Sequence, residues 1–181
     1  GAIVKAAFML YVGVRLRLWL RRCGNAPADK AFSRAMATLD SRRRVVVKNS
    51  GEAGALASWG LWRRYVLVPE HFTRDYTSEQ RFYVYLHELA HIQRLDTFKY
   101  LVVALAKILF WYHPIVLLSL RAFQNGVEFA CDHVVLGASG VSPTRYAECI
   151  LKTHSPRHFP SPGFASSRYA LEKRLPFIIG R

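Results

Sequence analysis

The hydrophobic pattern of this 181-residue chain predicts several amphipathic helices and a short region of strands. Its most regular part covers residues 78–96, where apolar residues recur every three or four positions. Thr77 and Gln80 have the spacing of a capping box, which is typical of a helix N-terminus. We therefore predict a helix from about Ser78 to Asp96, with three apolar residues in the core: Phe82, Leu86 and Leu89.

Strand signals precede this helix, and further helical patterns surround it. Three short stretches rich in β-branched or small residues are separated by turn-forming residues, at positions 45–47, 55–58 and 65–68. We predict that they form a small antiparallel sheet. Other helices are expected at residues 29–41, 142–153 and 167–177, with a Pro-rich loop at 154–162. The expected fold class is therefore α+β and mainly helical.

The first 22 residues have a pattern of their own. Residues 2–14 are apolar apart from Lys5, and the segment 15–22 then adds four arginines and a tryptophan. This arrangement is typical of the cytoplasmic end of a truncated transmembrane helix, or of an amphipathic helix that lies on the membrane surface. We therefore divide the chain into a membrane or interface helix, residues 1–22, and a globular domain, residues 23–181.

The predicted central helix carries a complete H-E-x-x-H motif at residues 87–91. His87 and His91 lie one turn apart on the same helical face, so both imidazoles can bind one zinc ion. Glu88 stands where zinc peptidases have the general base for the attacking water. We expect one zinc ion here, and we assign the catalytic role to Glu88.

A catalytic zinc ion needs a third protein ligand, and a second helical segment offers one. Glu128 and Asp132 are four residues apart among apolar neighbours, where unpaired carboxylates would be costly. We predict that Glu128 is the third ligand and that Asp132 accepts a hydrogen bond from the free N–H of a ligand histidine. Cys131 is an alternative ligand, although core packing is the preferred explanation for it. The longer motif with a third histidine is excluded, because Arg94 and Thr97 occupy its Gly and His positions.

Residues 100–120 are largely apolar and long enough to span a membrane. A straight helix of this length would rise about 30 Å and place His91 and Glu128 on opposite sides of the bilayer, where they could not share a metal. A central lysine and Pro114 also interrupt the run. We therefore predict two helices joined near residues 112–113, the first packed in the domain or dipping into the membrane surface, the second carrying Glu128.

The composition indicates a basic, membrane-facing protein. The chain has 26 Lys and Arg residues against 12 acidic ones, which gives a net charge of +14, and 51% of its residues are hydrophobic. These values favour an anionic lipid surface as partner, on the cytoplasmic side where basic residues gather. No recognition-helix or RNA-binding aromatic pattern is present, so we expect no direct contact with nucleic acid. The three cysteines lack metal-ligand spacing and are expected to be reduced: Cys23, Cys131 and Cys149.

Three segments of the chain resemble membrane zinc metallopeptidases of the BlaR/MecR antirepressor type, which transduce the β-lactam resistance signal: residues 87–96, 111–114 and 128–132. The resemblance covers residues from about 43 to the end and departs from the common pattern at His113 and His133. It implies a zincin-like fold of the gluzincin type in a bacterial cell membrane, with the catalytic domain on the cytoplasmic side. It also implies a protein substrate, either a transcriptional repressor or the protease's own chain.

The resemblance suggests two further assignments. Residues 55–58 look similar to the edge strand that pairs with extended substrate in zinc peptidases of this architecture, and a plain structural hairpin is an equal alternative. Arg174 is similar in position to a basic residue near the substrate carbonyl, which makes it an oxyanion candidate. A solvated cation or a lipid-headgroup contact is the preferred explanation for Arg174.

Two other functions stay open at the level of sequence. A housekeeping membrane protease for quality control or processing would use the same chemistry, and only regions outside this sequence would separate it from a signalling protease. A non-catalytic zinc-binding module is disfavoured, because structural zinc sites are closed and rich in Cys and His, whereas Glu88 stands where a general base belongs.

Overall fold

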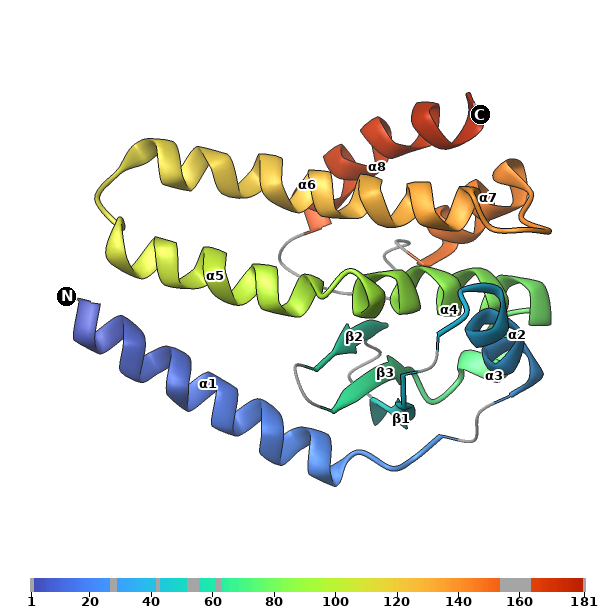
Figure 1. Ribbon diagram of the computed structural model, residues 1–181, viewed down its shortest axis with the longest axis horizontal. Coiled ribbons are helices and arrows are strands. Elements are labelled where there is room, and N and C mark those ends of the chain that lie inside the picture. The colour runs from blue at the N-terminus through green and yellow to red at the C-terminus, as the bar shows by residue number, and fades with distance from the viewer. Residues whose placement is uncertain are drawn as a thin grey trace.

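The computed structural model describes residues 2–26, 29–41, 43–51, 56–60, 63–153 and 164–180. These residues form the following elements in chain order: α1 (Ala2–Arg22), α2 (Lys30–Thr38), β1 (Val45–Asn49), β2 (Ala57–Trp59), β3 (Arg64–Val68), α3 (Phe72–Asp75), α4 (Ser78–Gln93), α5 (Asp96–Leu109), α6 (Pro114–Leu136), α7 (Pro143–Thr153) and α8 (Phe164–Ile179). The fold is α+β and mainly helical, as predicted. In Figure 1, α4 lies between the sheet with α2 on one side and α6 with α8 on the other.

Helix α4 forms the centre of the core because it is apolar on most of its faces. The predicted capping box is present: the Thr77 hydroxyl accepts a hydrogen bond from the Gln80 backbone N–H, and the Gln80 side chain accepts one from the Thr77 N–H. Tyr85 packs edge-on against Phe32 and Phe72, at ring-centroid distances of 5.2 and 5.5 Å. The three predicted core residues are at most 1% exposed: Phe82, Leu86 and Leu89. This packing fixes the directions in which the motif side chains point.

The sheet is mixed, which corrects the prediction of an antiparallel one. The strand order is β1-β3-β2, and β3 pairs antiparallel with β2 but parallel with β1. The chain reverses direction between β1 and β2 and again between β2 and β3, so β1 and β3 run in the same direction. Because β3 lies between the other two strands, it pairs with β1, and this pair is parallel. Turn signals in a sequence report these reversals but not the spatial order of the strands. Strand β2 is therefore an edge strand, and it contacts α4. Residue 55 of the predicted strand lies outside the described residues.

The other helices lie close to their predicted positions. Helices α2 and α7 match the expected segments, while α4 ends at Gln93 instead of near Asp96, which begins α5. Helix α8 is longer than predicted at both ends and contains Pro176. The predicted Pro-rich loop at 154–162 lies outside the described residues.

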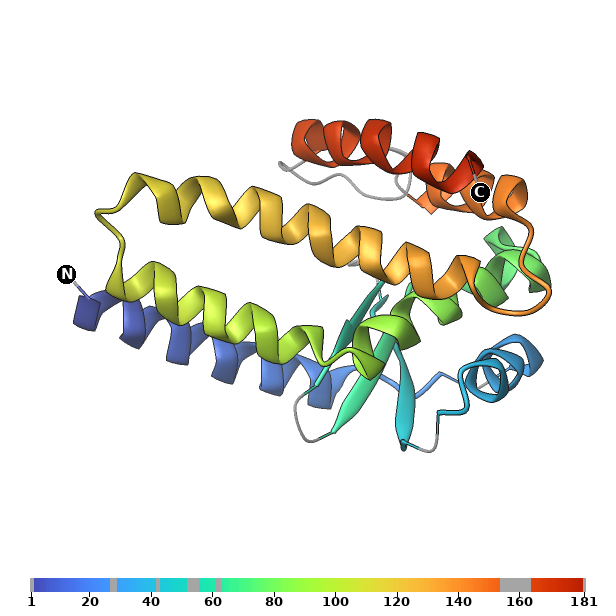
Figure 2. The same cartoon turned by 45° about the horizontal axis from the view of Figure 1, so that its top comes forward.

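The apolar run at residues 100–120 is divided between two helices, as predicted. Helix α5 ends at Leu109 and α6 begins at Pro114, whose fixed φ suits the first turn of a helix. The two helices lie side by side and antiparallel, and they extend away from the sheet (Figures 1 and 2). Tyr100 and Phe123 meet edge-on across the pair, with ring centroids 5.5 Å apart. Both ends of the run therefore lie next to each other, and α1 lies against α5.

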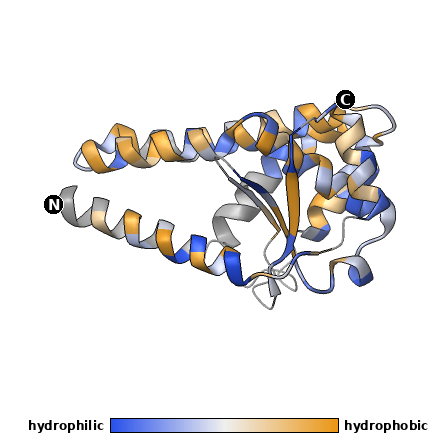
Figure 3. Cartoon of the chain, turned by 60° about the horizontal axis from the view of Figure 1, so that its bottom comes forward, coloured by the Kyte–Doolittle hydropathy of each residue, from blue (hydrophilic) through white to orange (hydrophobic). Residues whose placement is uncertain are grey.

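Apolar side chains cover much of this α5–α6 hairpin. Figure 3 shows its hydrophobic colouring, and nine of its large apolar residues are exposed: Phe98, Leu101, Val102, Leu105, Leu109, Phe110, Trp111, Tyr112 and Ile115. Within the described part of the chain, no helix combines the length and the apolar character that crossing a membrane requires. The described residues thus leave an apolar surface uncovered on the hairpin.

Candidate metal and catalytic centre

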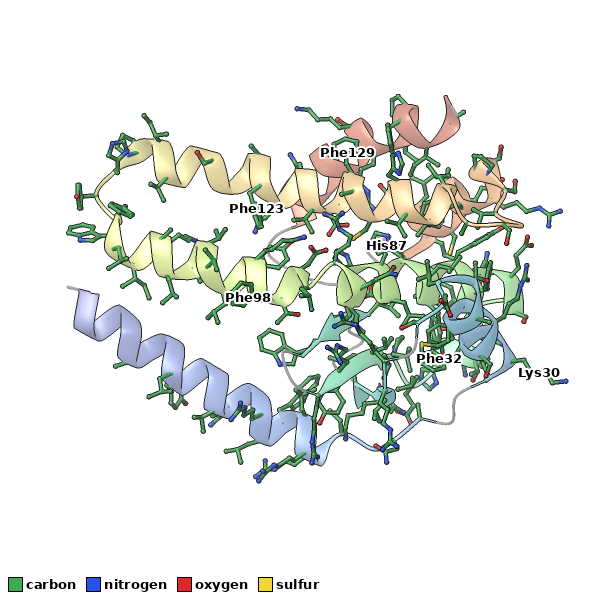
Figure 4. All side chains as sticks on the ribbon, viewed as in Figure 1. Lys30, Phe32, His87, Phe98, Phe123 and Phe129 are labelled. Atoms are coloured by element: carbon green, nitrogen blue, oxygen red, sulfur yellow. The ribbon has the colours of Figure 1, made fainter. Side chains whose placement is uncertain are left out.

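The structure brings the three predicted metal ligands together between α4 and α6, where Figure 4 shows His87. The Nε2 atom of His87 lies 3.2 Å from Nε2 of His91 and 3.4 Å from Oε2 of Glu128. The Nε2 atom of His91 lies 3.6 Å from Oε1 of Glu128. Ligand atoms placed tetrahedrally around zinc, about 2.1 Å from it, are separated by about 3.4 Å. The spacing of the three side chains therefore fits a zinc ion with one coordination position left open.

A row of buried side chains on α6 positions the two carboxylates. Val127, Cys131 and Val135 are four residues apart and at most 4% exposed, so they place this face of α6 against the core. Glu128 and Asp132 each follow a member of this row. Both carboxylates are thereby directed to the side of α6 that contacts α4.

Asp96 orients the second histidine of the motif. Leu95 adopts a left-handed conformation with φ of 57°, and this turn starts α5 beside the end of α4. The Oδ2 atom of Asp96 lies 3.0 Å from Nδ1 of His91, and Lys99 donates a hydrogen bond to Oδ1 at 2.7 Å. Burial disfavours the charge on Asp96, but the hydrogen bonds from His91 and Lys99 outweigh burial and hold its pKa well below the usual range. An ionised carboxylate only accepts, so Nδ1 of His91 carries the proton and Nε2 is free for a metal.

A tyrosine contacts the first histidine of the motif. The hydroxyl of Tyr146, on α7, lies 2.9 Å from Nδ1 of His87 and donates a hydrogen bond to Oδ1 of Asp132 at 2.7 Å. Nδ1 of His87 is 3.5 Å from Oδ1 of Asp132. The predicted contact between a ligand histidine and Asp132 is therefore long, and the Tyr146 hydroxyl, which lies beside both groups, makes a shorter contact with each of them.

Arg174 is buried beside both carboxylates of α6. Its Nε and Nη2 atoms donate to Asp132 at 2.7 and 2.6 Å, and its Nη1 atom lies 2.9 Å from Oε2 of Glu128. The side chain is 2% exposed, so the interpretation of Arg174 as a solvated cation or a lipid-headgroup contact is wrong. All three nitrogens already face carboxylates, which favours a role in holding Asp132 and Glu128 over the oxyanion role.

The electrostatics of the site favour a cation among the three ligands. Burial disfavours the charge on His87, but the nearby carboxylates of Asp132 and Glu128 outweigh burial and raise its pKa to about 9. Burial also disfavours the charge on Glu128, but the hydrogen bond and charge of His87 and the charge of Arg174 lower its pKa to about 2. When His87 and His91 are neutral with the proton on Nδ1, the Nε2 lone pairs of both rings face the same space, beside the Glu128 carboxylate. A divalent metal supplies the positive charge that this arrangement needs.

Glu88 lies in the same cavity as the three ligands. This cavity has a volume of about 410 Å³, and residues 56–58 on the side of β2 line it together with residues of α4, α5, α6, α7 and α8. Glu88 is 9% exposed, and none of the described residues forms a hydrogen bond or ion pair with its carboxylate. Glu88 therefore has the access to the cavity that a general base needs.

Cys131 lies behind His91, away from the Nε2 atoms. Its Sγ atom is 3.3 Å from Nδ1 of His91 and 3.4 Å from Oδ2 of Asp96, and these three residues form a second group with metal-ligand spacing. Burial and the charge of Asp96 raise the pKa of the thiol far above its usual range. The neutral thiol donates to Asp96, so Cys131 fits the packing role better than the role of a ligand beside Glu128.

Sequence reasoning missed the roles of Asp96 and Tyr146. Asp96 lies five residues after His91, and a carboxylate so close to a ligand histidine was a usable signal. Tyr146 lies 59 residues after His87, and nothing in its local pattern separates it from an ordinary core tyrosine. Only the packing of α7 brings Tyr146 to the site.

Comparisons with known proteins identify the family of the chain. Residues 1–178 match the family described as BlaR1 peptidase M56. Regulatory protein BlaR1 of Bacillus licheniformis is 26% identical over 129 residues, which are 71% of this chain and 21% of that protein. The methicillin resistance mecR1 proteins of Staphylococcus aureus and Staphylococcus epidermidis are each 25% identical over 112 residues, 61% of this chain and 19% of theirs. The chain thus spans about a fifth of the length of these relatives. Because the family match covers nearly all of its residues, the chain belongs to the BlaR1 peptidase M56 family.

Proposed function

We propose that this chain is the catalytic part of a membrane-associated zinc endopeptidase, a gluzincin with a zincin-like site that hydrolyses peptide bonds in proteins. The observation that carries the proposal is the convergence of two histidine Nε2 atoms and one glutamate carboxylate beside Glu88 in a cavity. The metal ligands are His87, His91 and Glu128, and the catalytic base is Glu88. Asp132 lies on the Nδ1 side of His87 and helps to hold this ligand in place.

Each part of the cavity has a role in peptide hydrolysis. A bound zinc ion would supply Lewis acidity, polarising the scissile carbonyl and lowering the pKa of water. Glu88 takes the proton of the attacking water and passes it to the leaving amine. Ala57 and Ser58 line the cavity and belong to the edge strand β2, whose free edge can pair with an extended substrate and align the scissile bond.

We further propose that the peptidase acts in signalling at a bacterial cell membrane, with its catalytic domain on the cytoplasmic side. The relatives named as a regulatory protein and as methicillin resistance proteins support this role. The substrate would be a transcriptional repressor, the protease's own chain, or both. The net charge of +14 and the apolar α5–α6 hairpin support contact with lipid, with residues 1–22 as a membrane or interface helix and residues 23–181 as the peptidase domain.

Metal content and proteolysis of the detergent-solubilised protein test this function together. We expect one zinc ion per chain by mass spectrometry and cleavage of unfolded protein or fluorogenic peptides. Glu88→Gln should keep the metal and abolish cleavage, because an amide cannot take the proton of water. Glu128→Ala should lose most of the metal, and Glu148→Gln, at an exposed position on α7, is the matched control. Wild-type protein that binds no zinc, or Glu88→Gln with wild-type cleavage, would refute the proposal.

A further inference from the structure

We propose that Tyr146 is a positioning residue for the metal site, whose hydroxyl links the N–H of His87 to Asp132 and directs Nε2 of His87 at the metal. The proposal rests on the zinc site proposed above and adds a residue outside the ligand set. Tyr146 comes from α7, while all three ligands come from α4 and α6.

The direction of each hydrogen bond follows from the partners of the hydroxyl. The ionised carboxylate of Asp132 only accepts, so the proton of the Tyr146 hydroxyl points at Oδ1 of Asp132, 2.7 Å away. A lone pair of the same oxygen then faces Nδ1 of His87 at 2.9 Å. Nδ1 must therefore carry a proton, and the neutral imidazole has its lone pair on Nε2, the atom that faces His91 and Glu128.

Asp132 makes only a long direct contact with His87. Arg174 fixes both oxygens of the Asp132 carboxylate, and the carboxylate is fully buried. At 3.5 Å, the Asp132 oxygen lies beyond good hydrogen-bond distance from Nδ1 of His87. The Tyr146 hydroxyl lies beside both groups, 2.9 Å from Nδ1 of His87 and 2.7 Å from Oδ1 of Asp132, so it makes the shorter contact with each and links the carboxylate to the ligand.

Core packing fixes the hydroxyl in this position. Tyr146 is 1% exposed, and its ring meets the ring of Tyr83 edge-on with centroids 6.0 Å apart. Tyr83 itself directs its hydroxyl elsewhere, to the Glu79 carboxylate at 2.9 Å. The orientation of His87 therefore depends on how α7 packs on α4, whereas His91 is oriented by Asp96, only five residues away in the chain.

Paired tyrosine variants of the detergent-solubilised protein test this role through zinc affinity, measured by competition with a chromophoric chelator. Tyr146→Phe should weaken zinc binding about 10- to 100-fold, the usual effect of removing a group that hydrogen-bonds a metal ligand. Tyr83→Phe removes a second buried hydroxyl from the same aromatic pair, but one with no contact to a ligand, so its affinity should equal that of the wild type.

Nitrogen NMR of the histidine rings in the zinc-loaded wild type gives a second readout. We expect a proton on Nδ1 of His87 and, in Tyr146→Phe, a shift of the His87 signals larger than that of His91. Wild type that binds no zinc would refute the proposed function. Wild type that binds zinc while Tyr146→Phe keeps the same affinity and His87 signals would refute only the role of Tyr146. If Tyr146→Phe does not fold, the wild-type spectrum decides, and an unprotonated Nδ1 of His87 overturns the proposal.

Discussion

The guanidinium of Arg174 donates two hydrogen bonds to the carboxylate of Asp132, at 2.7 and 2.6 Å, and neither residue is more than 2% exposed. A further nitrogen of Arg174 lies 2.9 Å from Glu128. The charges of Arg174 and Asp132 are removed from water, so each depends on the other for compensation. Helix α8 is thus joined to α6 through the residues that surround the metal site.

Removing Arg174 should destabilise the fold strongly. Arg174→Met leaves the fully buried Asp132 without its cation, and breaking a buried ion pair in this way costs about 3 to 5 kcal/mol. Chemical denaturation of the metal-free protein measures the change in the free energy of unfolding. Arg145→Met is the control, because the Arg145–Glu79 pair has a similar N–O distance of 2.8 Å but is exposed. Arg145→Met should lower the free energy of unfolding by less than about 1 kcal/mol. An equal decrease in both variants would show that the buried ion pair contributes little to stability.

The sequence was sufficient to predict the local parts of the site. The capping box at Thr77 and the apolar period placed the helix, and the spacing of His87 and His91 placed the two proposed ligands on one of its faces. The shared-metal argument also predicted that residues 100–120 form two helices and that α6 carries Glu128. In each of these cases the determining residues lie within a few helical turns, or the requirement of a shared metal restricts the distance between them.

The features that the sequence did not reveal depend on contacts between distant segments. Strand β1 runs parallel to β3 because β3 lies between β1 and β2, and a turn signal carries no information on that order. The burial of Arg174 depends on how α8 packs against Asp132, 42 residues earlier in the chain. A basic residue on a helix is usually exposed to solvent, so the residue type alone favoured an exposed position for Arg174.

Asp96→Asn should weaken the metal site without unfolding the chain. The amide can still contact His91 but no longer provides the negative charge that keeps Nδ1 protonated and Nε2 available. We expect zinc affinity to fall about 10- to 100-fold in a chelator competition assay. Asp75→Asn, a partly exposed carboxylate on α3, should keep wild-type affinity. An unchanged affinity for Asp96→Asn would restrict Asp96 to a structural role at the start of α5.

Zinc binding should compete with a proton on His87. Without metal, the carboxylates around His87 raise its pKa from 6.5 to about 9 against the effect of burial, while zinc binds the neutral imidazole. Apparent zinc affinity should therefore fall as pH drops below 9, by up to about tenfold per pH unit from this group. Calorimetry in buffers of different ionisation enthalpy should detect the released proton at pH 7. His133→Ala, at an exposed histidine of α6, should keep the same pH dependence, and a flat affinity between pH 6 and 8 would contradict the raised pKa.

The same pKa shift has the opposite consequence for the metal-free protein. Because the folded-state pKa of His87 lies above its ordinary value of 6.5, the stabilisation from its protonated form is complete below about pH 6.5. It is lost as pH rises through about 9. The melting temperature of metal-free protein should fall over this range, whereas zinc-loaded protein should show no such loss, because the metal replaces the proton.

The α5–α6 hairpin should enter the lipid without crossing it. Helix α5 has 14 residues and so is about 21 Å long, shorter than the roughly 30 Å of a bilayer core. Gln93 and Gln124 are exposed near the base of the hairpin, and Tyr112 is 65% exposed at its tip. In the full-length protein, on a Cys23→Ser background, Gln93→Cys and Gln124→Cys should react with an impermeant maleimide only from the cytoplasmic side. Tyr112→Cys should be protected from both sides until detergent is added.

Labelling at the base and at the tip distinguishes the possible arrangements. Glu148→Cys, on α7 away from the hairpin, is the control for cytoplasmic access, and Cys131 and Cys149 are at most 1% exposed and should stay unlabelled. If Gln93→Cys and Gln124→Cys react from opposite sides, the run spans the bilayer, and His91 and Glu128 cannot share a metal. If Tyr112→Cys reacts as readily as Glu148→Cys, the tip lies in water. Protection of the tip alone would place the cavity close to the lipid surface, where substrates held at the membrane reach it first.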